Sequence, residues 1–181
     1  DIVVAIDDNS VVSLARLFNE PAGQTMLINE GVPEDIVKDL DLLGFSSISN
    51  LMSAIKFAKY YEMGENDIVL TMLTDSMELY QSRLREMHQE HGEYSNTDAI
   101  ADHARHLQSI TTDNQIELSY TGKRRIHNLK YFTWVEQQGK TYEEIMDQWY
   151  QRDYWSDVQQ QVNEIDALID DFNAEVGLAK A

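Results

Sequence analysis

Two short apolar runs constrain the fold of this chain more than any other feature. The run "IVVAI" covers residues 2–6, and the run "IVLTML" covers residues 68–73. The first is continuously apolar, the second is interrupted only by Thr71, and both contain β-branched residues, a pattern typical of strands buried in a parallel sheet. Helix-like sequence follows each run, and alternation of strands with helices is typical of α/β proteins. The sequence therefore predicts an α/β fold with a parallel sheet and flanking helices.

Two parallel strands are too few to form a stable sheet alone, because a parallel sheet buries both of its faces and an isolated strand pair is marginal in water. We therefore expect further strands from polypeptide upstream of this chain. The sequence begins at Asp1, without a methionine and directly before the first apolar run. This start favours the interpretation that the chain is a fragment of a longer protein.

The second half of the chain has a different character. From about Tyr94 onward the segments are helix-like, with predicted caps at Asn96 or Thr97 and at Thr141, and the only strand-like sequence is "QIELSY" at 115–120. We predict one region over 1–94, which belongs to an α/β domain, and a helical extension over 95–181.

Composition excludes several classes of function. The chain has 14 basic and 32 acidic residues and a formal net charge of -18, so its surface repels nucleic-acid backbones and anionic membranes. Its apolar runs are much shorter than the roughly 20 residues that a membrane span requires. The absence of cysteine excludes disulfides and thiolate chemistry and fits a reducing compartment. We expect a cytoplasmic protein with no nucleic-acid or membrane partner.

Four of the five histidines form two pairs at i, i+3 spacing. His88 lies three residues before His91, and His103 lies three residues before His106. Each pair could share a helix face and hold a metal ion, but neither has the additional ligand spacing of a zinc helix motif. Exposed polar helix surface is the simpler interpretation, and we predict no metal site.

A basic segment stands out in this acidic chain. "GKRRIHNLKYFTW" at 122–134 holds four of the fourteen lysines and arginines. Two interpretations remain open: an anion-binding patch, or a cluster that pairs with acidic neighbours or lies at a subunit contact.

Three serines stand where an amphipathic helix begins. The stretch "GFSSIS" at 44–49 precedes apolar positions at helical spacing, and one hydroxyl would be enough to cap that helix. Ser46 or Ser47 could be that cap. Alternatively, a hydroxyl at this entrance could bind the polar atom of a ligand.

The stretch "LLGFSSISNLMSAIKFAKYY", followed by "DIVLTML" and "TDSMELY", resembles the carboxyl-terminal part of fold-type II pyridoxal-phosphate enzymes such as cysteine synthase and cystathionine beta-synthase. Gly44-Phe45-Ser46 matches the glycine-x-serine turn that opens a helix in that family. The chain is also similar to a subgroup described as pyridoxal-5'-phosphate-dependent protein subunit beta, over "FNEPAG" and "RIHNLKYFTWVEQQGKT". Two positions depart from the family pattern, because Ile48 replaces its second glycine and Thr74 replaces a proline.

The resemblance implies a cofactor site. Ser46 would hydrogen-bond the pyridine nitrogen of pyridoxal 5'-phosphate, and Gly44 would let the backbone approach the ring. Thr74, Asp75 and Ser76 would lie near the same ring edge. A neutral hydroxyl does not keep the ring nitrogen protonated, which in this family accompanies β-elimination or β-replacement on a small amino acid.

In that family, the lysine that forms the Schiff base and the glycine-rich phosphate loop lie upstream of the matching region. The resemblance therefore implies no catalytic residue in this chain and no activity for the chain alone. It implies a small amino-acid substrate, the upstream portion of the same enzyme as a partner, and a homodimer. The alternative is a non-catalytic helical interaction module whose two strands complete the sheet of a partner.

Overall fold

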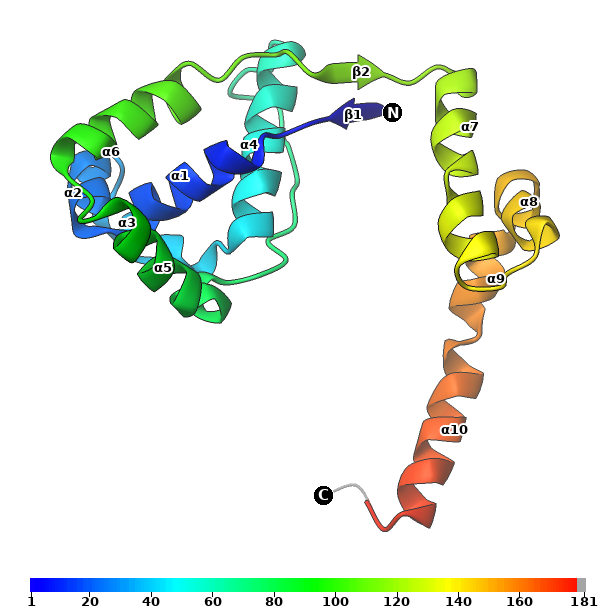
Figure 1. The fold of residues 1–181 in the computed structure, drawn as a ribbon. Helices are drawn as coiled ribbons and strands as arrows, with labels where there is room; N and C mark the ends of the chain where they lie inside the picture. Colours follow the sequence, from blue (N-terminus) through cyan, green and yellow to red (C-terminus); the bar gives the residue numbers. More distant parts are fainter. Residues whose placement is uncertain (179–181) are drawn as a thin grey trace. The chain divides into compact units, whose positions relative to one another are not determined.

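The computed structural model of the protein describes residues 1–178, which form two compact units (Figure 1). The N-terminal unit is Ile2–Glu117. The C-terminal unit begins at Leu118 and includes Asp1.

Both units are mostly helical. The N-terminal unit contains β1 (Ile2–Val4), α1 (Asp8–Asn19), α2 (Pro21–Asn29), α3 (Glu34–Lys38), η1 (Leu40–Leu42), α4 (Phe45–Tyr60), η2 (Met77–Tyr80), α5 (Gln81–His91), α6 (Asn96–His103), η3 (Ala104–Gln108) and β2 (Gln115–Glu117). The C-terminal unit contains α7 (Tyr120–Asn128), η4 (Tyr131–Glu136), α8 (Tyr142–Tyr150), α9 (Tyr154–Gln160) and α10 (Val162–Glu175).

The predicted α/β fold class, a fold-type II parallel sheet with flanking helices, is wrong for this chain. Within residues 1–178 the single sheet has two strands, and β1 pairs antiparallel with β2, with Val3 opposite Ile116. The second apolar run, 68–73, forms no strand. A strand in a parallel sheet needs a neighbouring strand on each side, and these two runs alone cannot provide such neighbours for each other. The core of this chain is therefore formed by helices.

The core of the N-terminal unit forms around α1, which α2, α4 and α6 contact. Asp7 caps α1 by accepting a hydrogen bond from the backbone N–H of Asn9 at 3.2 Å. The buried hydrophobic residues of α1 recur mainly at three- and four-residue spacing, which places them toward the other helices. They are Val11, Leu14, Ala15, Leu17 and Phe18.

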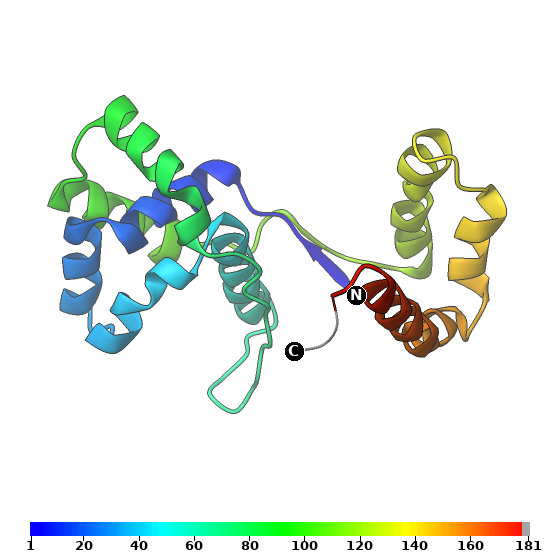
Figure 2. The ribbon, with the colours of Figure 1, turned by 90° about the horizontal axis from the view of Figure 1, so that it is seen from below.

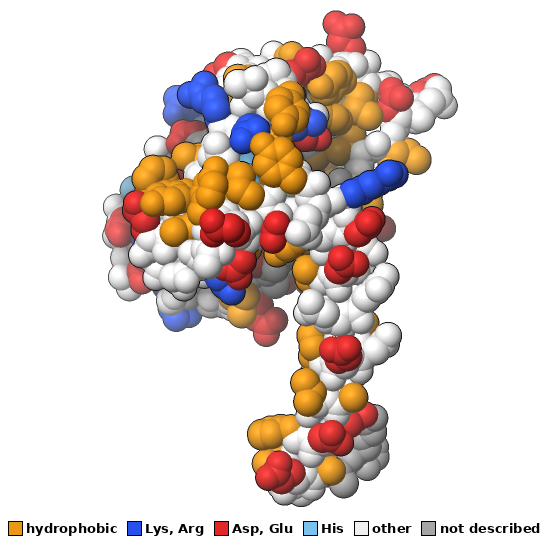
Figure 3. Space-filling view, turned by 90° about the vertical axis from the view of Figure 1, so that its right-hand side faces the viewer, with side chains coloured by type: hydrophobic (Ala, Val, Ile, Leu, Met, Phe, Trp, Pro, Cys, Tyr) orange, Lys and Arg blue, Asp and Glu red, His pale blue; other side chains and the backbone are white. Residues whose placement is uncertain are grey.

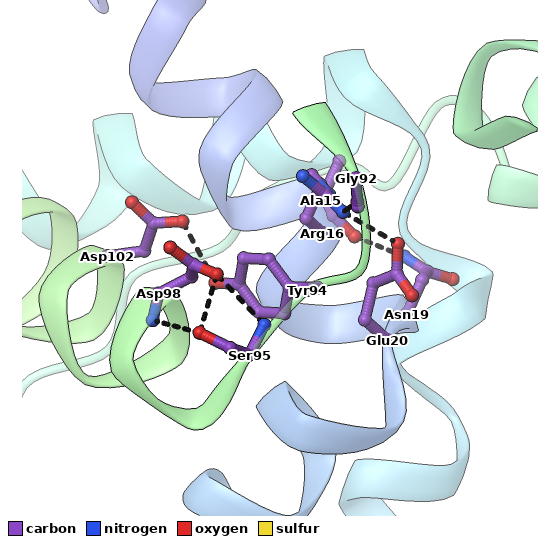
Figure 4. A network of polar contacts seen from close by, with 9 residues as sticks. All are labelled: Ala15, Arg16, Asn19, Glu20, Gly92, Tyr94, Ser95, Asp98 and Asp102. Atoms are coloured by element: carbon purple, nitrogen blue, oxygen red, sulfur yellow. Dashed lines mark hydrogen bonds and ion pairs between the residues drawn. The ribbon is translucent and has the colours of Figure 1, made fainter. Parts of the chain in front are cut away.

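A polar network joins α1 to the turn between α5 and α6 (Figure 4). The buried Arg16 donates to the backbone oxygen of Gly92 at 2.7 Å, and its guanidinium carbon lies 4.9 Å from the centre of the Tyr94 ring. The Tyr94 hydroxyl donates to Asp102 at 2.9 Å. Burial, followed by this hydrogen bond, raises the pKa of Tyr94 far above its usual value, so the phenol stays a donor.

The segment that follows Tyr94, from α6 to Ile110, belongs to the same core as α1, since Ala99 and Ile110 are buried in it. The compact units therefore divide between Glu117 and Leu118. The boundary predicted between residues 94 and 95 concerns where a cofactor-binding domain ends, whereas the boundary after Glu117 concerns compactness. The predicted boundary therefore stays a prediction.

The C-terminal unit uses much of the basic segment for its own contacts. Lys123 forms an ion pair with Asp1 at 2.9 Å, and the Arg124 guanidinium carbon lies 5.4 Å from the centre of the Tyr150 ring. Lys130 donates to Gln148 at 2.7 Å. Within residues 1–178 only Lys123 of this segment has an acidic partner, so both interpretations of the segment stay open.

No helix within residues 1–178 combines the length and the apolar character needed to cross a bilayer.

Candidate functional site

Asp75 organises the start of α4 from 28 positions along the chain. One carboxylate oxygen, Oδ2, accepts from the backbone N–H of Ser46 at 3.1 Å, and Oδ1 accepts from the N–H of Ser47 at 2.8 Å. Gly44 is the N-cap residue and has no capping side chain, so this distant carboxylate satisfies the first free N–H groups of the helix. A negative charge at this position also matches the helix dipole.

The buried Ser47 side chain holds Asp75 in this position. Its hydroxyl lies 2.8 Å from both the backbone oxygen and Oδ1 of Asp75, and it accepts from the Asp75 N–H at 3.2 Å. Gly44 donates its own N–H to the same backbone oxygen at 2.9 Å. Ser47 therefore binds a neighbouring segment instead of capping its own helix.

Tyr80 completes the arrangement. Its hydroxyl donates to Asp75 Oδ2 at 2.9 Å, and its ring packs on Phe45, with ring centres 4.8 Å apart at 71°. Burial of Asp75 raises its carboxyl pKa, but hydrogen bonds from the Ser47 hydroxyl, the two backbone N–H groups and Tyr80 outweigh it, so the pKa lies below its usual range. Asp75 is therefore a carboxylate near neutral pH.

A groove of about 680 Å³ opens beside this arrangement. Its wall includes the rings of Phe45 and Tyr80 and the exposed side chain of Ser46. The Ser46 hydroxyl makes no hydrogen bond with the described part of the chain, so it is free to bind a ligand. The remaining residues in the wall of the groove come from α1, α4 and α5: Asp8, Val11, Val12, Ser49, Asn50, Ser82, Arg83 and Glu86.

Of the five predicted cofactor residues, Ser46 lines the groove and the other four do not. Gly44 and Asp75 lie behind Ser46 and contact each other. The Ser76 hydroxyl donates to the Asp41 backbone oxygen at 3.2 Å and accepts from the N–H of Glu78, so Ser76 caps η2. Thr74 is exposed.

Asp8, Arg83 and Glu86 line the groove and were not predicted from the sequence. They are ordinary charged residues on amphipathic helices, and only the contact between helices brings them to one groove.

The groove fits one end of a pyridoxal phosphate molecule. The free Ser46 hydroxyl suits a pyridine nitrogen, and two aromatic rings border the same space. Arg83 is the one basic residue that the described chain places in the wall, and it already forms ion pairs with Glu86 at 3.0 Å and Glu90 at 3.7 Å. Among the described residues no lysine lines the groove. The groove therefore fits the ring-nitrogen edge, and it does not fit the phosphate or the aldehyde end.

The histidine pairs lie apart from this groove. His106 is 3.8 Å from Asp102, and burial lowers its pKa more than that carboxylate raises it. Within residues 1–178, no three histidine, aspartate or glutamate side chains are grouped closely enough to hold a metal ion.

Comparisons of the chain with protein-family models, with curated proteins and with solved structures gave no match.

Gly44 is needed for the approach of Asp75. A Cβ atom at this position would lie 2.5 Å from the carboxylate carbon of Asp75, although the backbone φ of -74° suits any residue. We expect Gly44→Ala to lower the free energy of unfolding of the N-terminal unit by about 2 kcal/mol, because it displaces the carboxylate from its donors. Denaturant unfolding followed by far-ultraviolet circular dichroism measures this.

Two comparisons isolate the cause. Gly64→Ala meets no atom within 4 Å and should change stability by less than about 0.5 kcal/mol. In an Asp75→Ala background the additional cost of Gly44→Ala should largely disappear, because the clash partner is gone. Additive effects of the two substitutions would contradict this explanation.

Proposed function

We propose that this chain is the carboxyl-terminal portion of a pyridoxal-phosphate-dependent enzyme that performs β-elimination or β-replacement on a small amino acid. Its own contribution is the hydroxyl that binds the pyridine nitrogen. The single observation that carries the proposal is that the Ser46 hydroxyl has no partner in the described chain and faces a groove bordered by two aromatic rings. The match of Gly44-Phe45-Ser46 to the family turn supports it independently.

When bound, the cofactor withdraws electrons from the amino acid. The role of Ser46 is to donate a neutral hydrogen bond, which leaves the ring nitrogen without a full positive charge and limits this withdrawal. Asp75 cannot replace Ser46 in this role, because its two oxygens already accept from α4 and Tyr80. The buried Ser47 and Asp75 hold the first turn of α4, so that Ser46 points its side chain from a rigid backbone.

The proposed reaction also needs a lysine and a phosphate site, which the groove does not provide. Polypeptide outside residues 1–178 would supply both, as the upstream portion of a homodimeric enzyme. The cysteine-free sequence is compatible with a cytoplasmic enzyme.

A titration with pyridoxine 5'-phosphate tests the role of Ser46. This compound has the ring and phosphate of the cofactor but no aldehyde, so it cannot react with surface lysines. We expect backbone amide resonances of residues 45–50 and 80–83 to shift on addition, and the Ser46→Ala variant to bind about 5- to 10-fold more weakly, the value of one hydrogen bond. Ser53→Ala, on the same helix but outside the groove wall, is the matched control and should bind as the wild type does. Equal affinity of the Ser46 and Ser53 variants would refute the assignment.

The exposed segment 68–73 favours a second candidate function, an interaction module that completes the sheet of a partner. Ile68 and Leu70 are both 89% exposed, and the segment runs as an open chain beside α4 (Figure 2). Within residues 1–178, the one backbone group of this segment with a hydrogen bond is the Met72 oxygen, which accepts from the Asn50 side chain at 2.9 Å. Unpaired backbone groups beside apolar side chains are what a strand from another polypeptide can bind.

The two candidates predict different results. Strand addition at 68–73 predicts that the amide hydrogens of this segment become protected from exchange when the partner binds, with no dependence on Ser46. Binding of pyridoxine 5'-phosphate predicts shifts around Ser46 and none that depend on Leu70. The variant Leu70→Lys should weaken strand addition and leave binding of pyridoxine 5'-phosphate unchanged.

A further inference from the structure

An uncovered apolar stripe runs along α10. Its members are separated by three and four residues in turn: Val162, Ile165, Ile169, Phe172 and Val176, the last at the C-cap. Each is about half exposed or more, from 48% at Ile165 to 61% at Phe172. Figure 3 shows apolar side chains along this helix, which extends downward in the view, among acidic ones. A stripe with this spacing is the seam of a coiled coil, in which the apolar residues occupy positions a and d of a heptad.

The same spacing continues backward into α9. Val158 lies four residues before Val162, and Trp155 lies three residues before Val158. Both are exposed, at 43% and 59%. Gln161 between the two helices has helical backbone angles, and its oxygen accepts from the N–H of Ile165 at 3.0 Å. The repeat thus covers three heptads, from 155 to 176.

The acidic residues avoid positions a and d, and two of them, Asp166 at e and Glu175 at g, lie beside the seam. With Val162 and Ile169 at position a, the outer positions b and c hold Asp157, Glu164, Asp170 and Asp171. In a parallel, in-register pair of this helix, a residue at position g faces position e of the next heptad in the partner. Gln161 would face Asp166, and Leu168 would face Asn173.

This arrangement matters in a chain with a net charge of -18. No acidic side chain of the described residues faces another acidic one across that seam. A second copy of the helix can therefore approach without the like-charge repulsion that the overall composition would suggest.

We propose that α10 pairs with α10 of a second copy of the chain as a parallel two-stranded coiled coil. Val162 and Ile169 in α10, and Val176 at its C-cap, are β-branched a positions, as in two-stranded coiled coils. The d positions Ile165 and Phe172 are not the leucines that complete that pattern, so the measured mass decides between two strands and a higher number. A helix of 14 residues is marginal in water without a partner for its apolar face, so burial of this stripe also stabilises α10 itself. This pairing does not depend on the cofactor proposal.

Sedimentation equilibrium of the whole chain over about a hundredfold range of protein concentration tests the pairing, because a dimer must form by mass action. We expect the mass to rise from one chain to two. Ile169→Asp places a carboxylate in the centre of the seam and should abolish the rise. Ala167→Asp adds the same charge two residues earlier, at the outer position f, and should leave it unchanged.

The direction of the pairing can be tested separately, since the chain has no cysteine. A single Val162→Cys substitution should form an intermolecular disulfide readily in a parallel pair, where residue 162 faces residue 162. In an antiparallel pair it would face the other end of the helix and should not be cross-linked. A chain that stays monomeric, a dimer that survives Ile169→Asp, a mass of three chains, or no cross-link at residue 162 would overturn the proposal.

Discussion

Replacing Asp75 by alanine is expected to lower the free energy of unfolding of the N-terminal unit by about 3 kcal/mol, because hydrogen bonds to a charged acceptor are worth about 1.5–3 kcal/mol each and only part of this is recovered by water. The carboxylate accepts from two backbone N–H groups of α4, from the Ser47 hydroxyl and from Tyr80. The variant leaves the buried Ser47 hydroxyl with only the backbone of residue 75 as a partner.

The measurement must report on the correct unit. All three tryptophans, Trp134, Trp149 and Trp155, lie in the C-terminal unit, so tryptophan fluorescence does not follow α4. Amide hydrogen exchange of α4 measures its local opening directly. Asp67→Ala is the matched control, because Asp67 caps one exposed N–H of Gly64 and its loss should cost less than about 1 kcal/mol. Equal effects of the two substitutions would contradict the role of Asp75.

The same carboxylate makes stability depend on pH in a defined direction. Its hydrogen bonds hold the pKa of Asp75 below the ordinary value of 3.8 in the folded state. A depressed pKa contributes stability that is complete above the unfolded pKa and is lost as the pH falls through the folded one. The difference in stability between the wild type and Asp75→Ala should therefore shrink below about pH 4. A constant difference down to pH 2 would show that charge is not involved.

Arg16→Ala is expected to lower the free energy of unfolding of the N-terminal unit by about 3 kcal/mol, from lost packing and from hydrogen-bond acceptors left without a partner. The side chain is 9% exposed, donates to the Gly92 oxygen and lies against Tyr94. Within residues 1–178 the Arg16 Nε–H is buried and has no hydrogen-bond partner. This unfavourable burial disappears in the variant and makes the expected loss of stability smaller. These contacts join α1 to the turn before α6 (Figure 4), so the variant should also speed amide exchange in α6.

Arg83→Ala is the comparison for Arg16. Arg16 forms an ion pair with Glu20 on α1, and Arg83 forms ion pairs with Glu86 and Glu90 on α5. The Arg83 side chain, however, is 40% exposed. Exposed ion pairs are worth about 0–1 kcal/mol, so this variant should change stability little. If Arg83→Ala costs as much as Arg16→Ala, burial of Arg16 is not the cause of the effect.

Local signals in the sequence predicted part of the fold. The cap predicted at Thr141 is confirmed, since Thr141 forms a capping box with Glu144 at the start of α8. The cap predicted at Asn96 or Thr97 is wrong by one or two residues, because Ser95 caps α6 in a capping box with Asp98. The helix that follows Gly44 was predicted from its apolar spacing, and it runs to Tyr60 as α4. Both signals act within a few residues, where pattern and structure are closely linked.

Contacts between distant segments could not be predicted in this way. The runs 2–6 and 68–73 have strand-like composition, but a strand exists only with a neighbour to pair with, and the described chain gives the second run none. Similarly, Asp75 caps α4 across 28 positions, and no local pattern in "TDSMELY" indicates which helix it meets. Of the predicted site, Ser46 reaches the groove because it occupies the first turn of a correctly predicted helix.

The pyridine nitrogen itself provides the most direct test of the proposal for Ser46. Pyridoxine 5'-phosphate labelled with nitrogen-15 in the ring reports protonation and hydrogen bonding through its nitrogen resonance when it is bound to the whole chain. We predict a resonance in the range of an unprotonated, hydrogen-bonded nitrogen that moves in the Ser46→Ala variant and stays in place in Ser53→Ala. A protonated ring nitrogen, or a resonance that is the same in all three proteins, would contradict the account.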